Sequence, residues 1–403
     1  MNLSNKRILI TQPILHNFCG STVVTIELAE YFKKCGAKVG IYAYTYDEPV
    51  VSELKKRKIK VYLAQDSTKL DLCRYDYVWI HSQVFPESMV KQLSTIHEAS
   101  ERPFFIFLHM STHDYIPDEF QWIYSFEDKI ADKVLFISEE VRDSHLQLME
   151  RKKDTDFFRN PAPIEFSMTR ATKNVLRKIL IVSNHVPKEL NDAVDILSKK
   201  GINVDHLGAN GKRYGLIAPT DINNYDAVIT IGKTVQYCIL GKRPVYIYDS
   251  FGGPGYLTRK NFNKAMAHNF SGRGFRKKKA TKIANEIVDG WGSAKKDINH
   301  ISEHYSKDFC INTVIDDIMK TIKKGNIPRI NNAQMLSIYY SQRLARYRFV
   351  DAYNLERKNA EYVATLEKLR LVNNRLQDYD KMLIVRAIIR LKNLMNRLRT
   401  IFV

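Results

Sequence analysis

The chain has few cysteines, and none stands at the spacing of a metal-binding or redox motif. Its five cysteines are scattered and odd in number, which argues against a closed disulfide framework. They are Cys19, Cys35, Cys73, Cys238 and Cys310. We therefore expect a protein of a reduced, cytosolic compartment.

Long hydrophobic runs are also missing. No stretch reaches the roughly 18 consecutive apolar residues of a membrane-spanning helix. The first residues, MNLSNKRILITQP, have only a short apolar run before Pro13, so we expect a strand there and not a signal peptide.

Acidic residues are scarce relative to basic ones. The chain has 63 Lys and Arg against 44 Asp and Glu, a net charge of +19. Such an excess favours a polyanionic partner, either nucleic acid or an anionic membrane surface. The position of the charge along the chain has to decide between the two.

Apolar runs of strand length alternate with amphipathic segments over residues 1–165 and again over residues 175–325. This alternation predicts an α/β fold with two Rossmann-like domains. The expected strands are Arg7–Thr11, Ala37–Tyr44, Ile59–Leu63, Tyr77–His81, Phe104–His109, Val134–Ser138, Lys178–Ser183, Ile202–Leu207, Ala227–Ile231 and Val245–Tyr248. The expected helices include Thr22–Lys34, Val50–Lys58, Glu87–Ser100, Asp118–Ala131, Glu139–Glu150, Lys188–Lys199 and a last amphipathic helix at Asp308–Lys323. The charged segment Met149–Asn174 suits a linker, and we read Asp154-Thr155-Asp156 within it as a solvated loop.

Two glycine-containing turns follow neighbouring strands of the second domain. The first turn places Gly232, Lys233 and Thr234 at a helix start, where free N–H groups, an ammonium and a hydroxyl attract anions. The second turn, residues 249–256, is expected to be a loop that approaches a ligand closely. Its candidate binding residues are Asp249, Gly252, Gly253, Gly255 and Tyr256. The two turns predict a diphosphate pocket, although ordinary connectors have the same appearance.

The Gly-Lys-Thr sequence is not a Walker loop, because the earlier glycine of that motif is absent. The sequence therefore disfavours a nucleoside triphosphatase.

Residues that follow strands of the first domain are expected at the same cleft. Gly20 and Ser21 would leave room for an acceptor, and His81, His109 and His113 are candidate polar groups. A histidine at a strand end is as often a satisfied structural side chain, so position alone supports His109 over the others.

The run YDAVITIGKTVQYCILGKRPVYIYD resembles the donor-binding core of GT-B glycosyltransferases of the family-4-like kind. Gly232 and Thr234 match the turn of that core, Gln236 matches the acidic residue of its helix, and Gly241 and Pro244 match its bend. Retaining members of those families carry two glutamates eight positions apart. Here the corresponding residues are Val228 and Gln236, so neither carboxylate is present.

The resemblance implies two Rossmann-like domains facing across a cleft. It also implies transfer of a sugar from a nucleotide-sugar donor to a lipid-linked or growing glycan acceptor, in surface polysaccharide synthesis. Lys233, Thr234 and the amides of residues 252–255 would bind the diphosphate, so no metal and no cofactor are expected. His109 matches the cleft histidine of these families and would lie near the reacting centre.

Residues 331–403 contain no glycine and no proline, which predicts one or two long helices, and they carry 14 basic and 6 acidic residues. A 4-3 spacing of Leu366, Leu369, Asn373, Leu376, Asp380 and Leu383 would make a short coiled-coil seam, so a homodimer is possible. From Lys381 onward there are six basic residues and no acidic one. The apolar stripe there is Ile384, Ile388, Leu391, Met395, Leu398 and Phe402. This composition favours a helix on the inner face of an anionic membrane.

Two other classes of function stay open. One is a non-catalytic scaffold that uses the helical tail, which the missing glutamates favour and the glycine turns disfavour. The other is a nucleotide-sugar epimerase, against which the tail counts. Nucleic-acid binding is weaker still, because the basic tail carries an apolar stripe and not aromatic stacking groups.

Overall fold

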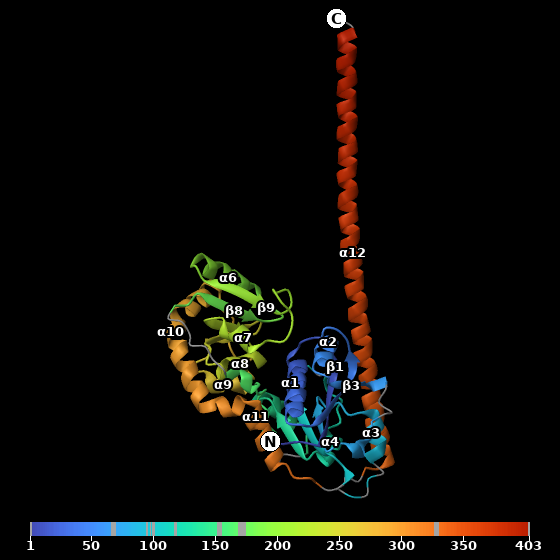
Figure 1. Ribbon diagram of the computed structural model, residues 1–403, viewed down its shortest axis with the longest axis vertical. Helices are drawn as coiled ribbons and strands as arrows, with labels where there is room; N and C mark the ends of the chain where they lie inside the picture. Colours follow the sequence, from blue (N-terminus) through green and yellow to red (C-terminus); the bar gives the residue numbers. More distant parts are fainter. Residues whose placement is uncertain are drawn as a thin grey trace. The chain divides into compact units, whose positions relative to one another are not determined.

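The computed structural model describes residues 2–401, except residues 66–69, 94–95, 97, 99–100, 117–118, 151–154, 168–174 and 326–329. Residues 1–347 form one compact unit, and residues 348–403 form a second. The compact unit contains two β-sheets with helices around them, as the sequence predicts (Figure 1).

The first sheet has seven parallel strands in the order β3-β2-β1-β4-β5-β6-β7. The strands are β1 (Arg7–Leu15), β2 (Lys38–Tyr46), β3 (Lys60–Leu63), β4 (Tyr77–His81), β5 (Phe104–His109), β6 (Lys133–Phe136) and β7 (Thr155–Phe157). The helices between them are α1 (Gly20–Lys34), α2 (Val50–Lys56), α3 (Glu87–Gln92), α4 (Tyr124–Ile130) and α5 (Glu139–Leu146). Its central strands β4 and β5 are apolar up to the histidine that ends each of them, as is typical of a parallel sheet with helices on both faces.

The second sheet has five strands in the order β12-β11-β10-β8-β9. The strands are β8 (Lys178–Val182), β9 (Asn203–Leu207), β10 (Ala227–Thr230), β11 (Val245–Asp249) and β12 (Gly252–Tyr256). The helices are α6 (Lys188–Lys199), α7 (Pro219–Asn223), α8 (Lys233–Leu240), α9 (Phe262–Ala267), α10 (Ala280–Tyr305) and α11 (Ile311–Thr321). The two Rossmann-like domains are therefore present; their exact boundaries stay predictions.

Two loop predictions are wrong. Residues 252–256 do not form a loop: they pair antiparallel with β11 as strand β12, and α10 packs against them. Thr155 and Asp156 belong to edge strand β7, where Asp156 pairs with Lys133 at 3.2 Å. Asp154 lies outside the described residues. In both places the hydrogen-bonding capacity of a neighbouring strand edge outweighs the local turn signals.

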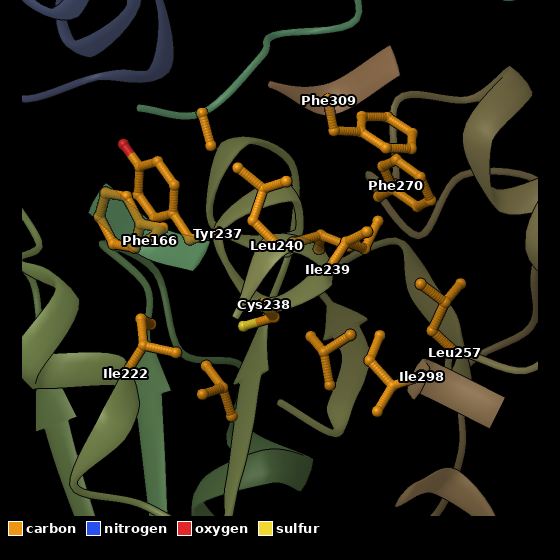
Figure 2. Close-up of a cluster of buried hydrophobic side chains, with 14 of the residues drawn as sticks. Phe166, Ile222, Tyr237, Cys238, Ile239, Leu240, Leu257, Phe270, Ile298 and Phe309 are labelled. Carbon is orange, nitrogen blue, oxygen red and sulfur yellow. The ribbon is translucent and has the colours of Figure 1, made fainter. Parts of the chain in front are cut away.

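The core of the second domain is a cluster around α8, which is buried on nearly every side (Figure 2). The Tyr237 ring stacks on Phe166, with ring centroids 3.9 Å apart. Phe270 and Phe309 close the other side of the cluster, so the chain before β8 and the chain after α10 share one core.

The end of the second domain returns to the first, as expected for the predicted last amphipathic helix. Ala162 and Cys310 form a parallel β-bridge, and the Tyr31 hydroxyl of α1 donates to Asp316 of α11 at 3.3 Å. After α11, Gly325 N donates to Asp132 at 2.6 Å. Both domains and their crossing segment thus belong to the same compact unit.

Residues 332–401 form one continuous helix, α12, which confirms the prediction of a long C-terminal helix. Its first turns belong to the compact unit, where Gln342 is fully buried and bonds Tyr44, Gln83 and Phe85. Beyond Arg348 the leucine and isoleucine side chains that the structure describes are exposed. The coiled-coil seam and the membrane stripe stay predictions. Phe402 and the side chains of Asp380 and Leu398 lie outside the described residues.

No helix among the described residues is both long enough and apolar enough to cross a membrane.

The β11–β12 hairpin gives a test of the corrected fold. A Cβ at Gly253 would lie 2.0 Å from the Ile247 carbonyl oxygen, so Gly253→Ala should lower the free energy of unfolding by about 2 kcal/mol or more. At Gly292, in α10, nothing lies within 4 Å of an added Cβ, so Gly292→Ala should stabilise by up to about 1 kcal/mol. Urea denaturation of both variants measures the difference, and equal stability would argue against the hairpin.

Candidate functional site

A cavity of about 460 Å³ lies between the two Rossmann-like domains. The carboxyl ends of β1 and β5 in the first sheet and of β8, β10 and β11 in the second open onto it. This is where ligands bind in open α/β sheets, and the volume is in the range of small-molecule sites.

Two helices begin at this cavity, one from each domain. Gly20 and Ser21 at the start of α1, and Gly232, Lys233 and Thr234 at the start of α8, line it. Neither helix is capped by the side chain before it. Gly232 has φ of +57°, which turns the chain from β10 into α8. First-turn N–H groups of both helices therefore face one space and favour an anion there.

The Lys233 ammonium is engaged across the domain boundary. It lies 2.6 Å from Glu27 Oε2 of α1, and both side chains are about one-tenth exposed. It also donates to the backbone oxygens of Asn160 and Pro161, and the Tyr237 hydroxyl donates to Glu27. Burial lowers the pKa of Lys233, which the Glu27 charge opposes, and burial raises the pKa of Glu27. Lys233 thus borders the cavity while it holds α8 against α1.

The second domain adds polar groups that sequence analysis did not single out. Ser183, Asn184 and His185 follow β8 and line the cavity. The rule that residues after parallel strands face the cleft would have found them. Across from them, the Phe18 N–H donates to the Tyr214 hydroxyl at 2.7 Å, and Asn184 donates to the Phe18 oxygen at 3.3 Å. These bonds close one side of the cavity.

Asp249 ends β11 and also lines the cavity. Its Oδ1 accepts a hydrogen bond from Ser250 N at 2.7 Å, and burial raises its pKa. The structure therefore brings Asp249 together with Gly232, Lys233 and Thr234, as the sequence predicts.

Gln236 and the remaining candidates after β11 lie elsewhere. Gln236 is fully buried and donates to the Arg159 oxygen at 3.3 Å. Gly252, Gly253, Gly255 and Tyr256 do not line the cavity, because they are residues of strand β12. The structure does not place the amides of residues 252–255 at a bound diphosphate.

His109 is a buried structural residue in this fold. Its Nε2 lies 2.8 Å from Glu127 Oε1, and its ring stacks on Phe136 with centroids 5.2 Å apart. Gln83 Nε2 donates to the other oxygen of Glu127 at 2.7 Å. His109 is fully buried and does not line the cavity, whereas the next residues, Met110 and Ser111, do. Its position at a strand end is therefore as predicted, but its side chain turns into the domain.

His81 and His113 are likewise outside the cavity lining. His81 Nδ1 lies 3.0 Å from Thr25 Oγ1 and 3.2 Å from Gln12 Oε1, within the core. His113 Nδ1 lies 2.5 Å from Ser144 Oγ, and its Nε2 lies 3.1 Å from exposed Asp114. Of the predicted acceptor-side residues, the structure brings only Gly20 and Ser21 to the cavity among the described residues.

The first domain instead contributes a carboxylate that sequence analysis missed. Glu119 lies in the segment between β5 and α4 and lines the cavity. Ser111 Oγ donates to Glu119 Oε2 at 3.2 Å, and Gln121 donates to the Glu119 backbone oxygen at 3.1 Å. Burial raises the pKa of Glu119, and the hydrogen bond from the Ser111 hydroxyl opposes this rise. No local sequence pattern marks this residue.

No group of three or more His, Cys, Asp or Glu side chains among the described residues is arranged to hold a metal ion.

No family model matches the chain, and no curated protein sequence matches it. Solved structures do resemble it. HepE from Anabaena, crystallised with UDP and glucose, has a TM-score of 0.50 at 14% identity, over 78% of this chain and 99% of that chain. A glycosyltransferase from Rickettsia africae has a TM-score of 0.51 at 16% identity, over 78% of this chain and 97% of that chain. The fold is the GT-B fold of glycosyltransferases.

The buried histidines predict an acid sensitivity. Burial lowers the pKa of His81 to about 3, and burial next to His109 lowers the pKa of His145 to about 2. Below pH 6.5 the unfolded chain takes up these protons and the folded chain does not, so stability falls as pH falls. Each buried histidine contributes about 1.4 kcal/mol per pH unit below its unfolded pKa.

His81→Gln should therefore reduce the slope of unfolding free energy between pH 6.5 and 5, as measured by urea denaturation. The exposed His304 is the control, since His304→Gln should leave the slope unchanged. An unchanged slope in His81→Gln would show that His81 titrates alike in both states.

Proposed function

We propose that the cavity between the domains binds a nucleotide sugar and that the protein transfers the sugar to an acceptor hydroxyl. The observation that carries this proposal is the cavity itself: two helix N-termini, one from each domain, face a space of about 460 Å³. A diphosphate suits such N-termini, because several backbone N–H groups can reach its oxygens. The structural likeness to HepE of Anabaena, crystallised with UDP and glucose, and to a glycosyltransferase of Rickettsia africae supports the same assignment.

The start of α8 would bind the diphosphate, with Thr234 and the backbone N–H groups as donors and Lys233 as the nearby cation. Preorganised donors at a departing diphosphate supply the main electrostatic stabilisation of such a transfer. We propose that no metal is required, since the helix start and Lys233 already offset the developing charge. Gly20 and Ser21 on the facing wall would border the acceptor.

The acceptor is proposed to be lipid-linked or a growing glycan, in the synthesis of a surface polysaccharide. The support for this is the C-terminal part of α12. Its described apolar side chains from Met382 to Met395 are exposed, and six basic and no acidic residues follow Asp380. Such a helix can lie in an anionic membrane interface and keep the enzyme near a lipid-anchored substrate. The cytoplasmic face is where a nucleotide-sugar donor would be met.

Nucleotide binding is the first consequence to test. UDP, TDP, GDP and their sugars should be compared by thermal shift, because a ligand of the folded state raises the melting temperature. At least one should give a shift at millimolar concentration. If none does, a non-catalytic scaffold that uses α12 becomes the better reading.

The same assay tests Lys233. Glu27→Gln/Lys233→Met removes the cation without leaving a buried charge, and it should weaken binding about 10- to 100-fold, since a charged hydrogen bond contributes about 1.5–3 kcal/mol. Lys188→Met is the control, because this lysine is exposed at 86%. Equal affinity in both variants would remove Lys233 from the diphosphate site.

The membrane proposal predicts a separable tail. Removal of residues from Lys381 onward should release the protein from vesicles that contain phosphatidylglycerol, because each basic residue near the surface contributes about 1 kcal/mol. Co-sedimentation measures this, and phosphatidylcholine vesicles are the control. An unchanged nucleotide shift would show that the shortened protein is folded. Unchanged sedimentation of that folded protein would contradict the tether.

A further inference from the structure

Two of the described residues that line the cavity are acidic, and they come from different domains. Asp249 ends β11 in the second domain, the domain that carries the start of α8. Glu119 comes from the first domain, which forms the facing wall. A nucleotide sugar whose diphosphate lies at α8 would bind to the second domain. Glu119 would then face it from the first domain, across the cavity.

The segment around Glu119 holds the carboxyl group in place. Ser111 Oγ donates to its Oε2 at 3.2 Å. Gln121 fixes the Glu119 backbone oxygen at 3.1 Å. Glu119 is not paired with a cation in these contacts, unlike Glu27, which is held by Lys233. Its carboxylate is thus positioned but still able to accept a proton.

Ser82 and Gln83, the two residues that follow β4, have an uncommon backbone conformation. Both have positive φ, +50° and +58°, although neither is glycine, and both are buried. Two consecutive left-handed residues cost free energy and persist only where surrounding contacts determine them. Here Gln83 donates to Glu127, which holds His109, and the buried Ser82 hydroxyl has no hydrogen-bond partner among the described residues.

Asp249 suits a different task. Its Oδ1 is already occupied by the following backbone N–H, and it belongs to the same domain as the start of α8. The acceptor hydroxyl has to attack the anomeric carbon from the face opposite the leaving diphosphate, so its base has to lie beside the hydroxyl on that face. Asp249 is better placed to contact the donor.

We propose that Glu119 is the general base that activates the acceptor hydroxyl, and that transfer inverts the anomeric configuration. This inference rests on the proposed function. In the step, the acceptor oxygen forms a bond to the anomeric carbon while the bond from that carbon to the diphosphate oxygen breaks. The electron pair of the broken bond leaves with the diphosphate, and the hydroxyl proton passes to the Glu119 carboxylate.

The two positions at which retaining relatives carry glutamates support inversion. Val228 is a fully buried core residue of β10, and Gln236 is fully buried in α8. Neither can supply a carboxylate to the anomeric carbon. A single displacement that is assisted by Glu119 needs no carboxylate at positions 228 and 236.

Hydrolysis of the donor tests the role of Glu119 before the acceptor is known, because water can replace the acceptor hydroxyl. UDP-glucose, UDP-galactose and UDP-N-acetylglucosamine are incubated with the wild-type chain, Glu119→Gln and the exposed control Glu150→Gln. UDP release should fall about 10²- to 10⁴-fold in Glu119→Gln, the usual contribution of a general base. The nucleotide-induced thermal shift should be kept, and Glu150→Gln should match the wild type.

Two readouts separate a base from a structural residue. These donors are α-linked, so NMR of the first sugar released should show the β-anomer. Azide needs no deprotonation, so it should restore UDP release in Glu119→Ala and give a β-glycosyl azide. If Glu119 had only a structural role, azide would not restore UDP release in Glu119→Ala.

Several outcomes would overturn the inference. A Glu119→Gln rate within about threefold of the wild type, or an initial α-product, would exclude Glu119 as an inverting base. The same holds if the wild type binds one of these UDP-sugars but releases no UDP from it, because a base poised for a hydroxyl should also activate water. The absence of any nucleotide shift in the wild type would instead remove the proposed function, and the role of Glu119 with it.

Discussion

The buried ion pair between Glu27 and Lys233 is the interaction on which the arrangement of the two domains depends. It joins the middle of α1 to the start of α8, which faces the cavity, and the Tyr237 hydroxyl completes it. Removal of one partner of such a pair typically costs 3–5 kcal/mol, because the other charge stays buried alone. The pair therefore holds the two walls of the cavity together at the start of α8, beside other contacts such as Arg273 with Glu140 and Phe18 with Tyr214. It also means that a diphosphate at α8 would share Lys233 with Glu27 and would rely more on backbone N–H groups.

Local patterns were sufficient for most of the architecture. The strands Tyr77–His81 and Phe104–His109 and helix Lys188–Lys199 have the predicted bounds, because period and composition agree there with the tertiary environment. The loop predicted at 252–256 failed for a physical reason. Glycine and proline favour turns locally, but the free edge of β11 offers hydrogen bonds that only an adjacent strand satisfies. A short stretch of sequence does not show which other strand it will pair with.

The site was predictable to the extent that it follows from topology. The rule that strand ends face the cleft located Gly20, Ser21, Gly232, Lys233 and Thr234 correctly. It cannot tell which way a side chain turns, and His109 turns inward to Glu127. Glu119 is the opposite case, since it lies in an irregular segment and reaches the cavity through contacts with Ser111 and Gln121. Only the assembled fold reveals such a residue.

The account makes one central claim, that the space between the domains is a nucleotide-sugar site with α8 at the diphosphate and Glu119 on the facing wall. A crystal structure with a bound UDP-sugar that raises the melting temperature tests it most directly. The account predicts the diphosphate within hydrogen-bonding distance of the N–H groups at residues 233 and 234, with the anomeric carbon exposed towards Glu119. A nucleotide bound outside the cavity, or a diphosphate directed away from α8, would contradict it.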